Sequence, residues 1–215
     1  MEAIFYFLAA LILINMPVIG PYMKMLNTVI HEVSHIIAAK VTGGKGHSIT
    51  LNADNSGLAE VSSPSWFGRV LTGYAGYTGS SAAALLLFYW LHIGYQAAVI
   101  LFVLCLTFLS AFLWIRNLVG LLWSITFVMI LGFMVYKQMF SLLWHISFLV
   151  SSIILIESII SSAYVLKISA KHPGEAGDAS SLSRLTKIPA VVWGMVFFSQ
   201  AIYTGYFIIN NFIWR

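Results

Sequence analysis

The chain has 215 residues, of which 60% are hydrophobic and only 8% are charged, and its formal net charge is +4. Soluble domains carry about 25% charged residues, so a chain with a mean hydropathy of +0.91 cannot hide its apolar side chains inside one water-soluble core. The cations form no basic run and no basic-aromatic strip, which argues against nucleic acid as a partner. We therefore expect residues 1–215 to form a single integral membrane domain in a lipid bilayer.

Seven apolar segments are long enough, or nearly so, to cross about 30 Å of hydrocarbon at about 1.5 Å per helical residue. The second is the least hydrophobic because it holds a polar cluster, and Pro17, Gly20 and Pro21 separate it from the first. The sequence thus predicts an all-α polytopic membrane protein with about seven transmembrane helices. The segments are 3–20, 23–42, 67–92, 96–115, 118–136, 140–166 and 189–211.

Two of the connections are longer than simple turns. In the loop 43–65, the stretches "HSITL" and "LAEVS" flank the turn-rich "NADNSG", which predicts a short β-hairpin after the second helix. The loop 168–188 is polar, and Pro173, Gly174 and Gly177 make its first half irregular. Its second half fits one or two amphipathic turns that lead into Pro189, a residue suited to the start of a helix.

The cations are distributed unequally between the two sides that seven spans would define. The N-terminus and the second, fourth and sixth connections would share one side, with eight cations against three on the other. Positive residues favour the cytoplasm, so we expect the N-terminus, the hairpin and the 168–188 loop to be cytoplasmic. The eight are Lys40, Lys45, Arg69, Arg116, Lys167, Lys171, Arg184 and Lys187.

The polar cluster of the second segment reads "NTVIHEVSHIIAAK". His31 and His35 are four residues apart, so one helix face presents both imidazoles about 6 Å apart, a spacing that suits one tetrahedral Zn²⁺. Glu32 lies beside them as the candidate catalytic base, which completes the H-E-x-x-H arrangement of metallopeptidases. Ionisable groups inside a membrane are functional candidates by default. The alternative is a hydrogen-bonded polar knot that joins helices.

Four stretches of the chain resemble the site-2 protease family of intramembrane zinc metalloproteases, especially its small bacterial peptidase family B-like branch. They are "HEVSH" at 31–35, "GYAGYTGSS" at 73–81, "IRN" at 115–117 and "GDASSLSRLTKIPAVVW" at 177–193. The resemblance implies zinc-dependent hydrolysis of transmembrane or membrane-associated polypeptides. It also implies a bacterial plasma membrane, and the cation count independently predicts that the active site opens to the cytoplasm. Any regulatory membrane partner is invisible in the sequence.

The resemblance further implies a third metal ligand, an aspartate beside the start of a distant helix, and Asp178 matches it. Here Ala179 follows the aspartate, where the better-known pattern has glycine. Asp178 is therefore either a ligand or only a helix N-cap. Glu60, 25 residues beyond His35, is a competing ligand because soluble metalloproteases place a glutamate at a similar distance.

Three further residues are open to more than one role. Gly76 belongs to a face of small residues that allows close helix approach, or lines a groove that binds substrate. Asn117 is a candidate oxyanion donor to substrate, or a packing or capping residue. Glu157 lies in mid-span, where it must face protein or water; it could pair with Arg116 or His145, in a structural or proton-handling role rather than as a metal ligand.

The sequence therefore favours an intramembrane zinc metalloprotease. An exposed edge of the hairpin would hold an unwound substrate by strand addition. Two other classes remain open: a zinc-binding membrane scaffold without catalysis, and a small metal or proton transporter whose path Glu157 and His145 would mark.

Overall fold

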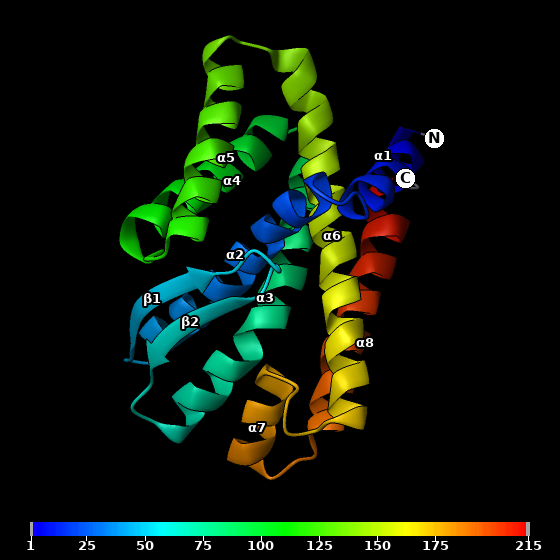
Figure 1. Ribbon diagram of the computed structural model, residues 1–215. Coiled ribbons are helices and arrows are strands. Elements are labelled where there is room, and N and C mark those ends of the chain that lie inside the picture. Colours follow the sequence, from blue (N-terminus) through cyan, green and yellow to red (C-terminus); the bar gives the residue numbers. More distant parts are fainter. Residues whose placement is uncertain (1, 214–215) are drawn as a thin grey trace.

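The computed structural model describes residues 2–213, and the side chains of residues 4–213. It consists of helices with one small β-hairpin beside α2 and α3 (Figure 1). The elements are α1 (Glu2–Ile14), α2 (Ile19–Val41), β1 (Lys45–Leu51), β2 (Gly57–Ser62), α3 (Trp66–His92), α4 (Gln96–Leu113), α5 (Leu118–Tyr136), α6 (Phe140–Lys171), α7 (Asp178–Thr186), α8 (Ala190–Ile208) and the π-helix η1 (Ile209–Ile213).

The seven predicted spans are not confirmed. Within residues 2–213, four helices are long and apolar enough to cross a membrane: α4, α5, α6 and α8 continued by η1. The pair Ile4–Ile14 and Ile19–Val41 would count as a fifth span only if the two helices, bent by 107°, act together. The predicted hairpin is confirmed, and the structure is a polytopic arrangement of four or five candidate spans.

The break between α1 and α2 explains why the first two segments are not two full spans. Helix α1 has 13 residues, which at about 1.5 Å per residue is too short for the hydrocarbon core. A turn follows, in which Gly20 donates its N–H to the Met16 carbonyl at 2.9 Å. The backbone of Gly20 lies against the Ile14 carbonyl so closely that a Cβ would collide with it. The chain therefore bends sharply here and returns into the molecule as α2.

Helix α3 is long enough to span a membrane, with 27 residues, but it is not hydrophobic enough to count among the candidate spans. Its buried positions are mostly small or hydroxyl-bearing, among them Gly76, Ser80, Ser81 and Ala84. Such residues let two helix backbones approach closely. A Cβ added at Gly79 would collide with Ser34 on α2, which confirms this role of the small-residue face. Its inner position, not lipid exposure, explains the low hydropathy of α3.

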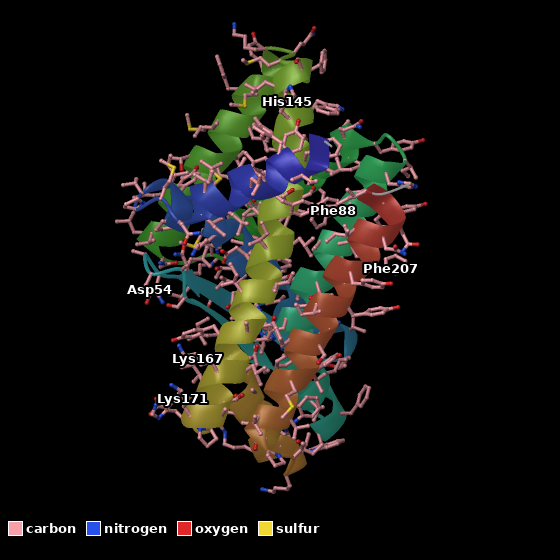
Figure 2. All side chains as sticks on the ribbon, turned by 90° about the vertical axis from the view of Figure 1, so that its right-hand side faces the viewer. Asp54, Phe88, His145, Lys167, Lys171 and Phe207 are labelled. Atoms are coloured by element: carbon pink, nitrogen blue, oxygen red, sulfur yellow. The ribbon has the colours of Figure 1, made fainter. Side chains whose placement is uncertain are left out.

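The bent pair also changes the expected position of the N-terminus. In Figures 1 and 2, which share one vertical axis, the start of α1 lies with the C-terminal end, far from α7. The cation count predicts the N-terminus on the α7 side, because two full spans before the hairpin are assumed there. Figure 2 shows Lys167 and Lys171 at the α7 end of α6 and His145 at its other end. The cation-rich loop 168–188 and the N-terminus therefore do not share a side in this structure.

The hairpin is joined on one edge to the connection between α4 and α5. Ile49 donates its N–H to the Trp114 carbonyl at 2.8 Å and accepts from the Arg116 N–H at 3.2 Å. Asn117 extends this pairing, since its side-chain Oδ1 accepts from Leu51 N at 3.0 Å and its Nδ2 donates to Leu51 O at 2.6 Å. Residues 114–117 therefore cover the outer edge of β1. The other edge of the hairpin, along β2, faces α2.

Candidate metal centre

Two histidines of α2 and one aspartate of α7 meet at a single point between α2 and α3. The Nε2 atoms of His31 and His35 lie 3.0 Å apart. Asp178 Oδ2 lies 3.1 Å from His31 Nε2 and 3.3 Å from His35 Nε2. The i, i+4 spacing on α2 brings the two imidazoles together, and the chain fold brings the aspartate from 143 residues further on.

The loop before α7 sets the position of Asp178. Gly177 has a positive φ of 52°, a conformation that favours glycine, and it turns the chain into the helix. Ser180 fastens the turn, because its hydroxyl accepts from Ala176 N and donates to Pro173 O, both at 2.7 Å. Leu182 is fully buried and packs near Gly73 of α3. Asp178 is the first residue of α7, not its N-cap, and its carboxylate points to the histidines.

The donor set fits a divalent cation. His35 Nδ1 lies 2.6 Å from the Thr72 carbonyl, which can only accept, so this nitrogen carries the hydrogen and Nε2 of the neutral ring presents a lone pair. Asp178 Oδ2 is buried and has no hydrogen-bond partner among residues 2–213. Separations of 3.0 to 3.3 Å match the edge of about 3.3 Å that a tetrahedron of zinc ligands at about 2.0 to 2.1 Å would have. Within the described part of the chain, these three residues form the group of donors that could hold a metal ion.

The charge of Asp178 agrees with a ligand role. Burial by itself raises the pKa of this carboxyl, but when the rings are protonated the charge on His35 and hydrogen bonds from His31 and His35 outweigh burial and hold the pKa well below its usual value, as the charge of a metal ion at the same point would. The side chain is therefore a carboxylate at neutral pH, the form that binds a metal ion.

Glu32 lies beside the three donors and is held by the hairpin. Its Oε2 accepts a hydrogen bond from Ala59 N of β2 at 2.7 Å, and the residue is only 5% exposed. Glu32 is not among the three donors that could hold a metal ion. Its role as a base stays a prediction.

Gly76 and Asn117, the expected substrate-binding residues, lie in different places. Gly76 lies under the imidazoles, where an added Cβ would stand 2.5 Å from His31 Nε2 and 2.6 Å from His35 Nε2. Asn117 uses both polar atoms of its side chain on the Leu51 backbone. In this conformation Gly76 makes room for the ring nitrogens and Asn117 fastens the hairpin. Their contacts with substrate stay predictions.

The other carboxylates and histidines of the sequence analysis lie apart from the centre. Glu60 is exposed on β2 and accepts from Ser48 Oγ at 2.8 Å. Glu157 pairs with Lys24 of α2 at 3.7 Å, so the expected pairing with Arg116 or His145 is wrong. His145 instead contacts the Tyr6 hydroxyl through Nδ1 at 2.6 Å. Asp178, not Glu60, is the carboxylate that joins the two histidines.

Two contacts of the centre were not foreseen from the sequence. The Thr72 carbonyl that orients His35 is a backbone group, and no side-chain pattern signals it. The Tyr77 ring packs edge-on against the His31 ring, with 4.6 Å between centroids. Tyr77 lies within the stretch "GYAGYTGSS", which carries part of the family resemblance. Nothing in the sequence distinguishes it from an aromatic residue that only packs between helices.

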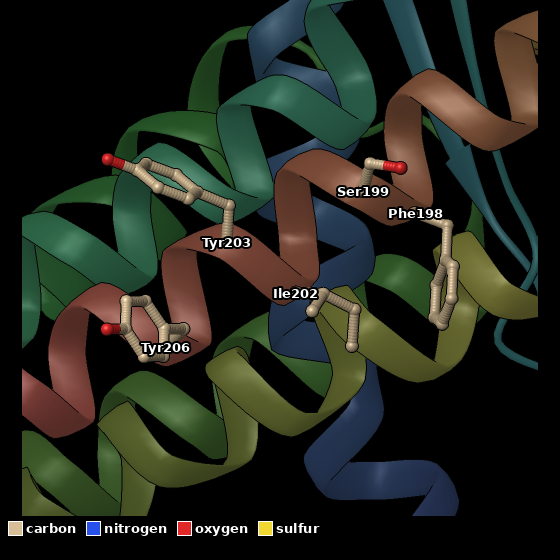
Figure 3. Close-up of a pocket in the computed structure, with 5 residues that line it drawn as sticks. All are labelled: Phe198, Ser199, Ile202, Tyr203 and Tyr206. Carbon is tan, nitrogen blue, oxygen red and sulfur yellow. The ribbon is translucent and has the colours of Figure 1, made fainter.

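A separate shallow pocket lies on the outward face of α8 (Figure 3). Its lining includes Tyr203 and Tyr206, each 65% exposed. None of the three metal-binding candidates lines it. The five lining residues are Phe198, Ser199, Ile202, Tyr203 and Tyr206. This surface is typical of a helix face in contact with lipid, where tyrosines are frequent near the membrane boundary.

Comparison with known families gave one match. A family model described as Peptidase M50B-like matches residues 3–208, nearly the whole chain. The match confirms the resemblance to site-2 proteases that the four quoted sequence stretches indicated. Comparisons with curated proteins and with solved structures found no match.

Proposed function

The chain belongs to the Peptidase M50B-like family, and from this membership we propose that it is an intramembrane zinc metalloprotease. The family supports a metallopeptidase in general, and the apolar helices support an integral membrane protein. The proposal adds zinc as the metal and a transmembrane or membrane-associated polypeptide as the substrate.

One observation carries the proposal: a cluster of three donor atoms beside a carboxylate that is not itself a ligand. The separations of 3.0, 3.1 and 3.3 Å between the donors leave room for one ion, with Glu32 next to His31 in the chain. Three protein ligands leave a fourth position open, as catalytic zinc sites do, whereas structural sites use four protein ligands. The geometry therefore favours a catalytic centre over a structural one.

Each side chain has a distinct part in this proposal. His31, His35 and Asp178 would hold the ion, and Thr72 fixes the ring of His35 through its carbonyl. When bound, zinc would act as a Lewis acid and lower the pKa of a coordinated water. Glu32 would take a proton from the attacking water and return it to the leaving amine, as a general base and then a general acid. The apolar surroundings strengthen these electrostatic interactions.

The outer edge of β2, which is the edge that faces α2, is the surface best suited to the substrate. The scissile segment must be extended before it can be cut, and backbone groups on an open strand edge can pair with it. Glu32 occupies the Ala59 N–H, so the Ala59 carbonyl, which points to the same edge, is a group with which a substrate strand would pair. A substrate strand there would run past Glu32 and the three donors.

The test is a cleavage assay in proteoliposomes with single-span reporter polypeptides, comparing the wild type with Glu32→Gln. We expect the variant to keep its zinc and to lose about 10²- to 10⁴-fold in rate, the usual contribution of general acid–base catalysis. Equal cleavage by both proteins would contradict the proposed role of Glu32.

The same preparations separate the rival functions. Zinc binding by a wild type that cleaves none of the reporters would favour a scaffold. Zinc or proton flux that depends on Glu157 and not on Glu32 would favour a transporter. In the structure Glu157 pairs with Lys24, and His145 contacts the Tyr6 hydroxyl.

A further inference from the structure

The hydrogen bond between the hairpin and Glu32 joins a backbone group to the proposed base. Ala59 N donates to Glu32 Oε2 at 2.7 Å, and Glu32 is buried with 5% exposure. A carboxylate at this depth is costly unless donors satisfy it. No other hydrogen bond to the Glu32 carboxylate is found among residues 2–213. This single donor therefore fixes which way the carboxylate faces.

The strand register explains why this N–H is available. Ile49 stands opposite Ala59, and Ile49 uses both its N–H and its carbonyl on residues 114 and 116, away from β2. Ile49 and Ala59 therefore form a non-hydrogen-bonded pair of the antiparallel ladder. In such a pair, both residues point their N–H and carbonyl groups away from the partner strand. Ala59 therefore directs its N–H to the open edge of β2, and α2 brings Glu32 to that edge.

Gly57 shapes the space around the second carboxylate oxygen. A Cβ at Gly57 would stand 2.5 Å from Glu32 Oε1 and 2.8 Å from Glu32 Cγ. The φ of Gly57 is not positive, so its backbone does not require glycine. Glycine is needed at position 57 because the Glu32 side chain occupies the space that a Cβ would fill.

We propose that the outer edge of β2 positions the catalytic base: the Ala59 N–H holds Oε2 of Glu32, and the bare Gly57 leaves room for Oε1 as the proton acceptor. This inference rests on the proposed function, and it assigns the hairpin a role beyond substrate binding. Ala59 and Gly57 are positioning residues, since they act through Glu32. The opposite reading, that the hairpin withholds Glu32 from the reaction, predicts a rate increase when the bond is removed.

The first test removes only the donor. Ala59→Pro lacks the N–H, and proline is tolerated on an edge strand where the N–H is outside the ladder. Val61→Pro is the matched control, because its N–H points to the same side two residues further along β2. We expect Ala59→Pro to lower kcat by about 10²-fold, the effect of a misplaced catalytic group, with unchanged zinc content and KM within about threefold of that of Val61→Pro.

An unchanged kcat in Ala59→Pro would overturn the proposal, and so would an increased kcat. Gly57→Ala is the second variant, and we expect the same loss of kcat with retained zinc. A loss of zinc or of folded protein in both variants would show a merely structural role for the hairpin, which also overturns the proposal.

The second test needs no activity. Site-resolved amide exchange should show the Ala59 N–H protected in the wild type and unprotected in Glu32→Ala. The Val61 N–H should exchange at the same rate in both proteins. Equal exchange of Ala59 in both proteins would overturn the contact itself.

The two tests separate this inference from the proposed function. A wild type that cleaves nothing, together with protection of Ala59 that depends on Glu32, would reject the protease and retain the contact. Cleavage together with unchanged rates in Ala59→Pro would retain the protease and reject the positioning role.

Discussion

At the scale of single residues, the centre brings three possible ligand atoms to one point, where either a proton or a metal cation must offset the repulsion of their lone pairs. The lone pair of His35 Nε2 faces the Asp178 carboxylate at 3.3 Å, because the Nδ1 hydrogen is used on the Thr72 carbonyl. A hydrogen on His31 Nε2 would be shared with His35 Nε2 at 3.0 Å, and within residues 2–213 this leaves the buried Asp178 Oδ2 without a hydrogen-bond partner. The arrangement is therefore better explained as a metal site than as a polar contact between helices.

Gly76→Ala tests how tightly the ring nitrogens are packed. The added Cβ would stand 2.5 Å from His31 Nε2 and 2.6 Å from His35 Nε2, so the imidazoles must move. We expect zinc affinity to fall by at least about tenfold, in the range found when the surroundings of metal ligands are altered. The zinc affinity is measured by competition with a chromogenic chelator.

Gly132→Ala is the control for this change. Gly132 lies within α5 and nothing stands within 4 Å of its added Cβ, so zinc affinity should not change. The role of Gly76 would be contradicted by equal affinities in the two alanine variants.

At the scale of elements, the side chain of Asn117 pairs with β1 as the backbone of a neighbouring strand would. Its side-chain amide pairs with both backbone groups of Leu51, a residue with 0% exposure. This pairing extends the contact between residues 114–116 and β1 by one more residue. It fastens the hairpin to α5 and so helps to hold the β2 edge against α2.

Asn117→Ala should destabilise the protein without removing a metal ligand. Two buried backbone groups of Leu51 would lose their partners, and we expect a loss of about 2 to 4 kcal/mol in unfolding free energy. A lower melting temperature in detergent, with the zinc stoichiometry of the folded fraction unchanged, is the expected result. An unchanged melting temperature combined with a large fall in kcat would instead support the predicted oxyanion role of Asn117.

The ion pair between Lys24 and Glu157 joins α2 to α6. The side chain of Glu157 is 9% exposed and that of Lys24 is 28% exposed, with 3.7 Å between the charged atoms. Lys24→Met would leave the carboxylate buried without a partner, which we expect to destabilise the protein by about 3 to 5 kcal/mol.

The double variant Lys24→Met, Glu157→Leu tests the reason for that loss. Removal of both charges should restore most of the stability, because replacing a buried pair by apolar residues is often neutral. Thermal unfolding of the three proteins in one detergent is the measurement. Equal destabilisation in the single and double variants would contradict the unpaired charge as the cause.

At the scale of the whole molecule, the ends of the helices differ in charge. Lys167, Lys171, Arg184 and Lys187 are exposed around the end that carries α7, and Figure 2 shows the first two there. Positive residues favour the cytoplasmic side. We propose that the α7 end, which supplies Asp178, faces the cytoplasm.

Single-cysteine labelling tests this orientation after Cys105→Ser. In intact cells, an impermeant maleimide should label Gln138→Cys, in the connection at the other end of α6, and leave His172→Cys unlabelled until the membrane is opened. The reverse pattern would contradict the orientation.

The sequence predicted those parts of the molecule that depend on local spacing. His31, Glu32 and His35 follow from one turn of helix, and the hairpin follows from a turn-rich stretch between two β-prone ones. Asp178 came from the family resemblance. The Thr72 carbonyl and the Ala59 N–H are backbone groups that any residue supplies, so no sequence pattern marks them.

The differences between the predicted and the observed helix arrangement have a physical cause as well. Hydropathy counted α1 and α2 as two spans, but the close contact of Gly20 with the Ile14 carbonyl bends them into one pair. Lys24 lies 133 residues from Glu157, and such distant pairing has no local signal. Contacts between distant segments therefore had to come from the structure.

Elemental analysis of the protein purified without chelators, alongside His31→Ala, His35→Ala, Asp178→Ala and Glu60→Ala, addresses the metal centre most directly. We expect one zinc per chain in the wild type and in Glu60→Ala, and a severe loss in the other three variants. A wild type that is folded but holds no stoichiometric metal even after zinc is supplied, or equal zinc content in all five proteins, would contradict a centre formed by His31, His35 and Asp178.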